Sequence, residues 1–297
     1  MSTSEATGNF LSNYPRPVKT YHAEPYPRIH PSNFSGKGKT VLITGGATGI
    51  GRSIAQAFAE TGIARVVIVA RSPGPLEKAK QGLRAEYPDV EVLTYSASLT
   101  DYARMHEVLK EVGSLDILVH SAAATHDHVP IMQVPTSEMQ DTYDTNVVAP
   151  FDLVKSCIAL PKPFSGGPKT VINISSGSAH MQIPNQSGYG SSKAAFVQIM
   201  ASFTSEYTPA KDAVRLFSVH PGAFYTPLAA TQYGKDDFDW EDIRLPGHFC
   251  TWLALGGTEP DFLHGRFVWA HWDVDELVAM KESVEGDGGL LKIGLIQ

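Results

Sequence analysis

The sequence predicts an α/β fold built on a doubly wound parallel sheet in a single domain. From Lys39 onward, short runs of apolar and β-branched residues alternate with amphipathic stretches. The runs are apolar throughout, which is typical of parallel strands buried on both faces. Repeated strand–helix units imply right-handed crossovers within one sheet. No internal repeat is visible in the 297 residues, which favours one domain over two.

Each β-branched run is expected to form a strand, and each amphipathic stretch a helix. The expected strands, in chain order, are Thr40–Thr44, Arg65–Ala70, Val90–Tyr95, Leu115–His120, Thr170–Ser175, Val214–Val219 and Arg266–Trp269. The expected helices are Gly49–Thr61, Pro75–Tyr87, Asp101–Val112, about Ser137–Leu160, Ser187–Tyr207 and Leu245–Leu255. The regular part of the chain, residues 38–297, is therefore the predicted catalytic domain, and it ends in a short C-terminal tail.

Residues 1–37 differ in composition from everything after them. Their prolines alternate with tyrosines and polar residues, and no helical or strand period is present; these prolines are Pro15, Pro17, Pro25, Pro27 and Pro31. The segment is expected to be an extended arm that lies on the domain surface or mediates contact between subunits. A partly ordered tail is the alternative.

Composition excludes several classes of protein. The net charge of −7, with 31 acidic and 24 basic side chains, argues against a nucleic-acid binder. Cys157 and Cys250 form neither a metal-ligand spacing nor a disulfide framework, which suits a reducing compartment. The N-terminus lacks the apolar core of a secretory signal, and no apolar run is long enough to cross a bilayer. We expect a cytoplasmic protein that binds neither nucleic acid nor membrane.

A glycine-rich turn, Thr44–Gly51, joins the first expected strand to the first helix. Glycines at such a turn allow the backbone to approach a pyrophosphate, and the helix N-terminus offers N–H groups to the phosphates. The second strand ends in Ala70 and Arg71, without the carboxylate that usually accepts hydrogen bonds from an unphosphorylated ribose. Arg71 can pair with a 2′-phosphate, although it could also be an ordinary surface cation. The sequence therefore predicts NADP(H) in preference to NAD(H).

A second motif points to proton transfer. Tyr189 and Lys193 are four residues apart in an expected helix, so they share one face. A phenol has a reference pKa near ~10, and a neighbouring ammonium favours its ionised form. Ser176 follows the strand that ends at Ser175, which places its hydroxyl at the edge of the sheet where ligands bind in this architecture.

Together with Pro221-Gly222, these motifs resemble the short-chain dehydrogenase/reductase family over residues 38–270. The segment 265–276 is similar to a subset of fungal members, which suggests specialised (secondary) metabolism. The resemblance implies a Rossmann-type fold, a nicotinamide cofactor and tyrosine-centred proton transfer. It implies that Ser176 and Tyr189 bind the substrate oxygen and that Lys193 holds the cofactor ribose and lowers the Tyr189 pKa. Asn146 would position a water in a proton relay.

The resemblance also implies a set of cofactor-binding residues. They are Thr44, Gly45, Thr48, Gly49, Ile50, Gly51, Arg71, Ser98, Leu99, Ser121, Ala122, Tyr189, Lys193, Pro221, Gly222 and Thr226. Two departures from the family pattern bear on cofactor affinity. His120-Ser121-Ala122-Ala123 replaces the usual Asn-Asn-Ala-Gly, and Ser98 replaces the usual aspartate near adenine.

Residues 223–252 are expected to form a substrate lid that is rich in aromatic side chains. Within it, Phe249 and Trp252 are expected to belong to the core. The substrate-pocket candidates are His126, His180, Met181, Phe224 and Tyr225. This lining suits a bulky apolar or polycyclic substrate. His126 and His128 lack further ligands at a convincing spacing, so no metal is expected.

The sequence thus predicts an NADP(H)-dependent carbonyl reductase or alcohol dehydrogenase that acts on a bulky hydrophobic small molecule, with Tyr189 as acid/base. The alternative is a nucleotide-binding protein of the same fold with a non-redox role, as a cyclase or isomerase, or a regulatory one. The family resemblance implies a homodimer or homotetramer packed through the helices expected at 137–160 and 187–207.

Overall fold

The computed structural model describes residues 15–294, and its centre is a seven-stranded parallel sheet. The strands are β1 (Thr40–Thr44), β2 (Arg65–Ala70), β3 (Glu91–Ser96), β4 (Ile117–His120), β5 (Lys169–Ile174), β6 (Val214–His220) and β7 (Phe267–Trp269). Their spatial order is β3-β2-β1-β4-β5-β6-β7. The direction of winding reverses between β1 and β4, and ligands bind at the carboxyl ends of strands beside such a switch point.

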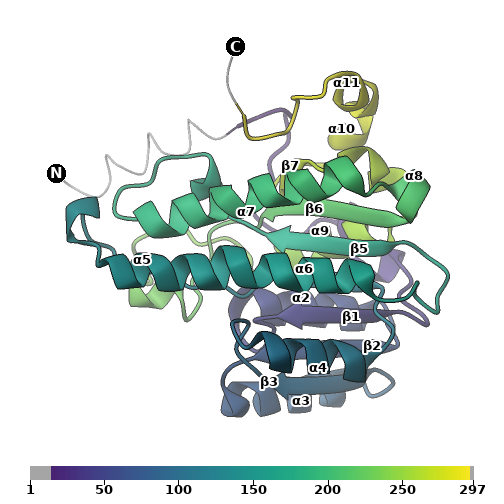
Figure 1. Cartoon of the computed structure of the whole chain (residues 1–297). Helices are drawn as coiled ribbons and strands as arrows, with labels where there is room; N and C mark the ends of the chain where they lie inside the picture. Colours follow the sequence, from purple (N-terminus) through teal and green to yellow (C-terminus); the bar gives the residue numbers. More distant parts are fainter. Residues whose placement is uncertain (1–14, 295–297) are drawn as a thin grey trace.

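Helices cover both faces of the sheet, so the predicted doubly wound parallel sheet in a single domain is confirmed (Figure 1). One face carries α2 (Gly49–Glu60), α3 (Pro73–Glu86) and α9 (Leu245–Leu255). The other carries α4 (Tyr102–Val112), α6 (Ala149–Ala159) and α7 (Ser187–Glu206). The remaining helices are α5 (Thr136–Tyr143), α8 (Pro209–Asp212), α10 (Val274–Ala279) and α11 (Lys281–Gly286).

The strands are apolar throughout because successive side chains enter different cores. In β1, Val41 and Ile43 belong to the core beneath α2, α3 and α9, whereas Leu42 belongs to the core beneath α4, α6 and α7. All five residues of β1 are buried. This two-sided burial is the physical origin of the sequence pattern that predicted the fold.

The helix expected at about 137–160 is interrupted. α5 is followed by a π-turn at Asp144–Val148, and only then by α6. Pro150 has no N–H to donate to the carbonyl of Asn146 four residues earlier, and the N–H of Ala149 bonds Asp144 five residues back. The interruption therefore falls on Asn146, a predicted site residue.

Residues 15–37 of the N-terminal arm lie against the C-terminal part of the chain. Tyr21 forms an antiparallel bridge with Trp272, and the N–H of His22 donates to the carbonyl of His271 at 2.7 Å. Arg28 pairs with Glu259 and Asp275 at 2.7 Å each. Residues 1–14, which the sequence assigns to the same arm, lie outside the described residues.

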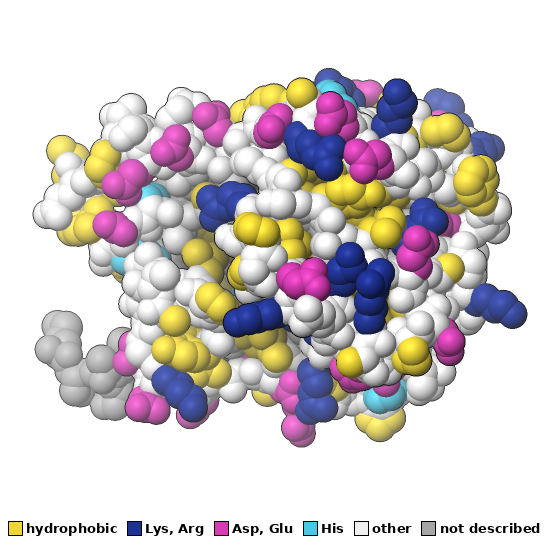
Figure 2. Space-filling view, turned by 90° about the horizontal axis from the view of Figure 1, so that it is seen from below, with side chains coloured by type: hydrophobic (Ala, Val, Ile, Leu, Met, Phe, Trp, Pro, Cys, Tyr) yellow, Lys and Arg dark blue, Asp and Glu magenta, His cyan; other side chains and the backbone are white. Residues whose placement is uncertain are grey.

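Charges on the face seen in Figure 2 are mixed. Basic and acidic side chains are interspersed over it, and they do not gather into one basic patch. Within residues 15–294, no helix combines the length and apolar character needed to cross a membrane.

Candidate active site

A cavity of about 480 Å³ lies at the carboxyl ends of the strands, around the switch point. Its walls come from the loops that follow β1, β2, β3, β4, β5 and β6, and from the first turns of α2 and α7. Every predicted cofactor-binding residue except Thr44 lines it. Of the four predicted catalytic residues, Ser176, Tyr189 and Lys193 line it as well.

The turn between β1 and α2 requires glycine at defined places. Gly45 and Gly49 have φ angles of +69° and +54°, which L side chains rarely adopt. A Cβ on Gly45 would lie 2.9 Å from the backbone N and Cα of Ala122, and one on Gly51 would lie 2.5 Å from the carbonyl oxygen of Gly45. The Thr48 side chain makes no capping bond to any described residue, so the first N–H groups of α2 remain available to an anion.

Arg71 stands at the end of β2 and lines the cavity. Its side chain is exposed and forms no ion pair with any carboxylate in residues 15–294. Nearby, the Ser98 hydroxyl hydrogen-bonds to that of Thr100 at 2.9 Å, and Leu99 is buried. The Arg71 guanidinium is thus a charge without an ion-pair partner among the described residues, at the part of the cavity wall that follows β2.

Thr44 is fully buried, and its hydroxyl braces the adjacent loop. The backbone N–H groups of Ser121 and Ala122 donate to its oxygen at 3.1 and 3.2 Å. The hydroxyl proton is therefore free to go to Nδ1 of His120, 3.0 Å away. Burial, with a smaller effect of Lys193, lowers the His120 pKa to about 3, so this imidazole is neutral. Thr44 shapes the cavity from behind its wall.

Tyr189 lies in the first turn of α7, with Lys193 one turn further on. The Lys193 ammonium is 5.6 Å from the centre of the Tyr189 ring and donates to the carbonyl of Ile174 at 3.0 Å. Burial lowers the pKa of Lys193 to about 8. Burial also raises the pKa of Tyr189 to about 12, opposed by hydrogen bonding with Ser176. This direction is opposite to the expected lowering, and it leaves Tyr189 as a neutral phenol at pH 7.

Asn146 is buried in the π-turn, and it is absent from the described residues that line the cavity. Its amide oxygen accepts from the N–H of Ala124 at 2.8 Å, and its nitrogen donates to the Ala124 carbonyl at 2.8 Å and to the Ser192 hydroxyl at 3.0 Å. The Ser192 hydroxyl donates in turn to the carbonyl of Tyr189 at 2.8 Å. The amide therefore braces the loop after β4 against α7.

None of the five predicted substrate residues is among the described residues that line the cavity, although each lies within five positions of one along the chain. His126 is buried between the loop after β4 and the start of α7. The His180 ring packs 5.2 Å from Phe267, and Met181 packs against the core beneath α9. Phe224 is buried, whereas Tyr225 is exposed and lies 5.5 Å from Trp240. Their contact with a substrate stays a prediction.

The segment expected to be a lid has two parts. Its end, from Leu245 on, is the start of α9, where Phe249 and Trp252 are fully buried, as expected for core residues. Residues 223–244 form the outer part, in which Tyr225, Tyr233, Phe238 and Trp240 make a chain of ring contacts at 5.1–6.4 Å. Tyr233 reaches both neighbouring loops, because its hydroxyl accepts from Gln186 at 3.1 Å and its ring contacts His128 at 5.3 Å.

The base of this outer lid is held by Glu241. One carboxylate oxygen accepts from the N–H of Ala223 at 2.7 Å, and the other lies 2.7 Å from Nε2 of His271. His271 is buried and stacks on Tyr21 of the N-terminal arm, with 4.7 Å between ring centres. The arm is therefore connected to the lid through two side chains.

Several lining residues were not singled out from the sequence. They include Thr145, Ser175, His220, Leu228 and Thr231. His220 carried the clearest signal, since it ends β6 directly before Pro221-Gly222. The Ser175 hydroxyl is buried and has no hydrogen-bond partner among the described residues.

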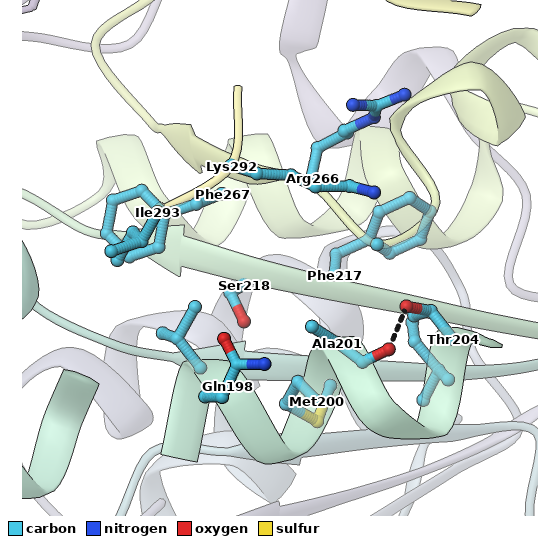
Figure 3. Close-up of a pocket in the computed structure, with 13 residues that line it drawn as sticks. Gln198, Met200, Ala201, Thr204, Phe217, Ser218, Arg266, Phe267, Lys292 and Ile293 are labelled. Atoms are coloured by element: carbon cyan, nitrogen blue, oxygen red, sulfur yellow. Dashed lines mark hydrogen bonds between the residues drawn. The ribbon is translucent and has the colours of Figure 1, made fainter. Parts of the chain in front are cut away.

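A second cavity, of about 290 Å³, lies between α7, β6, β7 and the C-terminal segment (Figure 3). Met200 and Phe217 contribute apolar walls, and the Thr204 hydroxyl in its rim is engaged with the Ala201 carbonyl at 2.7 Å. None of the predicted catalytic residues lines it. Within residues 15–294, no group of three or more His, Cys, Asp or Glu side chains is arranged to hold a metal ion.

The sheet order, the glycine turn and the cavity at the switch point define a Rossmann-type fold. Residues 39–237 match the family model described as short chain dehydrogenase, and the chain belongs to this family of oxidoreductases. The predicted family is confirmed, and its fold implies a nicotinamide cofactor.

Two fungal proteins are similar to this chain at high identity. The short chain dehydrogenase/reductase AacuD of Aspergillus aculeatus is 51% identical, over 95% of this chain and 97% of that protein. A short chain dehydrogenase/reductase of Claviceps purpurea is 46% identical over the full length of both. Among solved structures, a short-chain type dehydrogenase/reductase from Mycobacterium ulcerans has a TM-score of 0.70 at 25% identity. The match covers 79% of this chain and 89% of that protein's chain.

Proposed function

We propose that this protein transfers a hydride between NADP(H) and a carbonyl or hydroxyl of a bulky hydrophobic small molecule, polycyclic compounds being the first candidates. One observation carries the proposal: Ser176, Tyr189 and Lys193 line the same cavity as the glycine turn of β1 and α2. We infer a cytoplasmic role in fungal specialised metabolism, which the similarity to fungal relatives supports.

Three features of the cavity fit a nicotinamide dinucleotide. The turn at Gly45 and Gly51 leaves no room for a Cβ against its own neighbouring backbone, as the tight turn of a dinucleotide-binding site requires. Arg71 lines the cavity with no carboxylate partner among the described residues. The orphaned hydroxyl of Ser175 offers a buried polar contact. The turn and α2 would hold the pyrophosphate, and Lys193 the nicotinamide ribose.

The bound cofactor supplies the hydride, and the chain manages the proton. Because Tyr189 is a neutral phenol at pH 7, its hydroxyl can donate a proton to a substrate carbonyl oxygen. The Ser176 hydroxyl provides a second hydrogen bond to that oxygen. Burial places the pKa of Lys193 at about 8, so its ammonium is present at neutral pH and stabilises the phenolate that forms.

We propose that Asn146 serves the proton relay through its backbone. Its side-chain amide is already bonded to Ala124 and Ser192. Its carbonyl lies opposite the proline of α6, which has no N–H to offer. A free carbonyl at this place can hold the relay water, while the side chain fixes the loop after β4.

Substrate and assembly remain part of the proposal. We assign His126, His180, Met181, Phe224 and Tyr225 to the substrate because each lies within five positions, along the chain, of a residue that lines the cavity. The aromatic outer lid supports an apolar substrate. Pairing of two subunits through α6 and α7 is supported by the exposed side chain of Phe151 on α6, which stacks on Phe203 of α7 at 5.8 Å, and by the exposed Val148 just before α6. We expect a homodimer or homotetramer.

The test of the reaction type uses NADPH and phenanthrenequinone, a planar polycyclic diketone. The protein is mixed with both, and the absorbance of the reduced nicotinamide is followed. We expect the absorbance to fall only when protein and diketone are both present. If NADPH binds but is not oxidised with this or any of a panel of apolar ketones, the non-redox or regulatory alternative is favoured.

The cofactor preference is tested by Arg71→Ala. Loss of a charge-assisted hydrogen bond costs about 1.5–3 kcal/mol, so the KM for NADPH is expected to rise about 10- to 100-fold. The KM for NADH is expected to stay within about twofold, because NADH has no 2′-phosphate to lose. Arg84→Ala, an exposed arginine on α3, is the matched control and should change neither value. An equal effect of Arg71→Ala on both cofactors would contradict the preference.

A further inference from the structure

The proposed chemistry needs two hydroxyls to meet one oxygen atom, yet they come from separate elements. Ser176 follows β5, whereas Tyr189 lies in the first turn of α7, after a connecting loop. A misplacement of about 1 Å can cost two orders of magnitude in rate. Something must therefore fix the backbone beside each residue, and in both cases the structure shows an imidazole there.

The first imidazole belongs to His220. The N–H of Gly177, the residue after Ser176, donates to Nδ1 of His220 at 2.9 Å. A backbone N–H can only donate, so Nδ1 must carry the lone pair and the ring must be the neutral Nε2–H form. Trp269 packs edge-on against this ring at 4.2 Å, which fixes its orientation. Burial, followed by the nearby His271 and His180, holds the pKa of His220 well below its usual range.

The second imidazole belongs to His126. The N–H of Gly188, the residue before Tyr189, donates to Nε2 of His126 at 2.9 Å. Nδ1 of the same ring lies 2.6 Å from the carbonyl of Asp127, to which it must donate. These two bonds fix the opposite tautomer, the neutral Nδ1–H form.

The His126 bond also completes the start of α7. The first N–H groups of a helix have no partner within the helix, and the Gln186 side chain at the N-cap makes no capping bond to the described residues. His126 takes that place, and it needs a glycine beneath it, because a Cβ on Gly188 would lie 2.6 Å from Cδ2 of the ring. The imidazole therefore holds the helix turn that carries Tyr189.

We propose that His220 and His126 are positioning residues that set the distance between the Ser176 and Tyr189 hydroxyls. Each neutral ring accepts the backbone N–H of the glycine next to one of them. The inference rests on the proposed function of Ser176 and Tyr189. The two histidines come from different strand ends, β6 and the loop after β4, so they hold the connecting loop from both sides.

A crossed substitution tests this, because the accepting nitrogen differs at the two sites. Asparagine places its amide oxygen near the position of Nδ1, and glutamine places it near Nε2. We expect His220→Asn and His126→Gln to keep kcat within about threefold of the unmodified protein. The mismatched His220→Gln and His126→Asn should lower kcat about 10- to 100-fold. The assay is NADPH oxidation with phenanthrenequinone, and kcat is counted per NADPH-binding site so that unfolded protein does not contribute.

The dissociation constant of NADPH should stay within about twofold in the two His126 variants, because His126 does not line the cavity. His220 does line it, so there the asparagine and glutamine variants should bind NADPH within about twofold of each other while their kcat values differ. Equal kcat for asparagine and glutamine at a site would overturn the proposal for that site. So would a change confined to KM, which indicates substrate contact, or a mismatched variant that no longer binds NADPH. Failure of the unmodified protein to oxidise NADPH would instead contradict the proposed function itself.

Discussion

The nucleotide end and the lid end of the cavity are built in different ways. At the nucleotide end, the turn Gly45–Gly51 is shaped by glycine conformation and by close approach to two neighbouring loops, at Ala122 and Thr226. At the lid end, Glu241 joins Ala223 to His271, and Tyr233 joins two further loops. The first region depends on backbone that only glycine allows to approach its neighbours, and the second on contacts made by polar and aromatic side chains. Changes at the two ends should therefore have different consequences.

The largest effect on stability is expected when a core tryptophan, Trp252, is compared with a lid tryptophan, Trp240. Trp252 in α9 is fully buried, and Trp252→Ala should lower the free energy of unfolding by about 3–5 kcal/mol. Trp240 belongs to the outer lid and is only partly buried, so Trp240→Ala should cost about 1 kcal/mol or less while changing the substrate KM. Urea denaturation measures both. Equal destabilisation would show that the outer lid is part of the core.

A matched pair of glycines isolates the nucleotide end. Gly45 and Gly62 have nearly the same φ, +69° and +68°, but only at Gly45 would a Cβ meet backbone atoms, at 2.9 Å. Gly45→Ala should weaken NADPH binding about 10- to 100-fold, because the turn must shift away from the pyrophosphate.

Gly62→Ala is the control for backbone strain. It should cost about 1–2 kcal/mol of stability and leave NADPH affinity unchanged. Isothermal titration calorimetry and thermal unfolding provide the two measurements. A similar loss of affinity in both variants would mean that strain, and not the close approach, sets the cofactor site.

The smallest effect is a pH dependence at the junction of the two ends. Burial lowers the Lys193 pKa to about 8 from the ordinary 10.5, so the ammonium is lost as pH rises through 8. The Kd for NADPH should rise by up to about tenfold between pH 7 and pH 9, because only about a tenth of Lys193 is still charged at pH 9. Lys193→Arg keeps its charge throughout and should remove the pH dependence. A flat profile in the unmodified protein would contradict this assignment.

The same Lys193 shift affects stability with a definite sign. Between pH 8 and pH 10.5 the unfolded chain binds a proton that the folded chain does not. The contribution of Lys193 to the free energy of unfolding therefore rises with pH between pH 8 and pH 10.5. Below pH 8, Lys193 is charged in the folded protein and the full cost of burying that charge applies.

The contrast between the two ends also explains how much the sequence predicts. The strands were found because burial on both faces leaves continuous apolar runs, as in Val41, Leu42 and Ile43. The cavity wall at the nucleotide end could be predicted because its glycines and Arg71 stand at fixed distances from those strands; that it binds a cofactor stays a prediction. Every residue predicted to bind the cofactor lines the cavity except Thr44, whose hydroxyl is used behind the wall, but the lining also includes residues that the sequence did not single out.

The remaining features depend on contacts that sequence spacing does not encode. The π-turn at Asn146 follows from Pro150 but has no periodic signature. The docking of the arm through Tyr21 and the tie between Glu241 and His271 join residues far apart in the chain. Helices α8, α10 and α11 are too short to establish a helical period. The raised pKa of Tyr189 reflects burial, which the four-residue spacing to Lys193 does not reveal.

The most direct test of the account is the NADPH oxidation rate of Tyr189→Phe, measured with phenanthrenequinone beside NADPH binding by fluorescence titration. Removing one hydroxyl deletes the proton donor and leaves the ring and the cavity wall in place. We expect the rate to fall at least about 100-fold, within the range of general acid catalysis, with the Kd for NADPH unchanged within about twofold. A rate near that of the unmodified protein would contradict the assignment of Tyr189 as the acid/base.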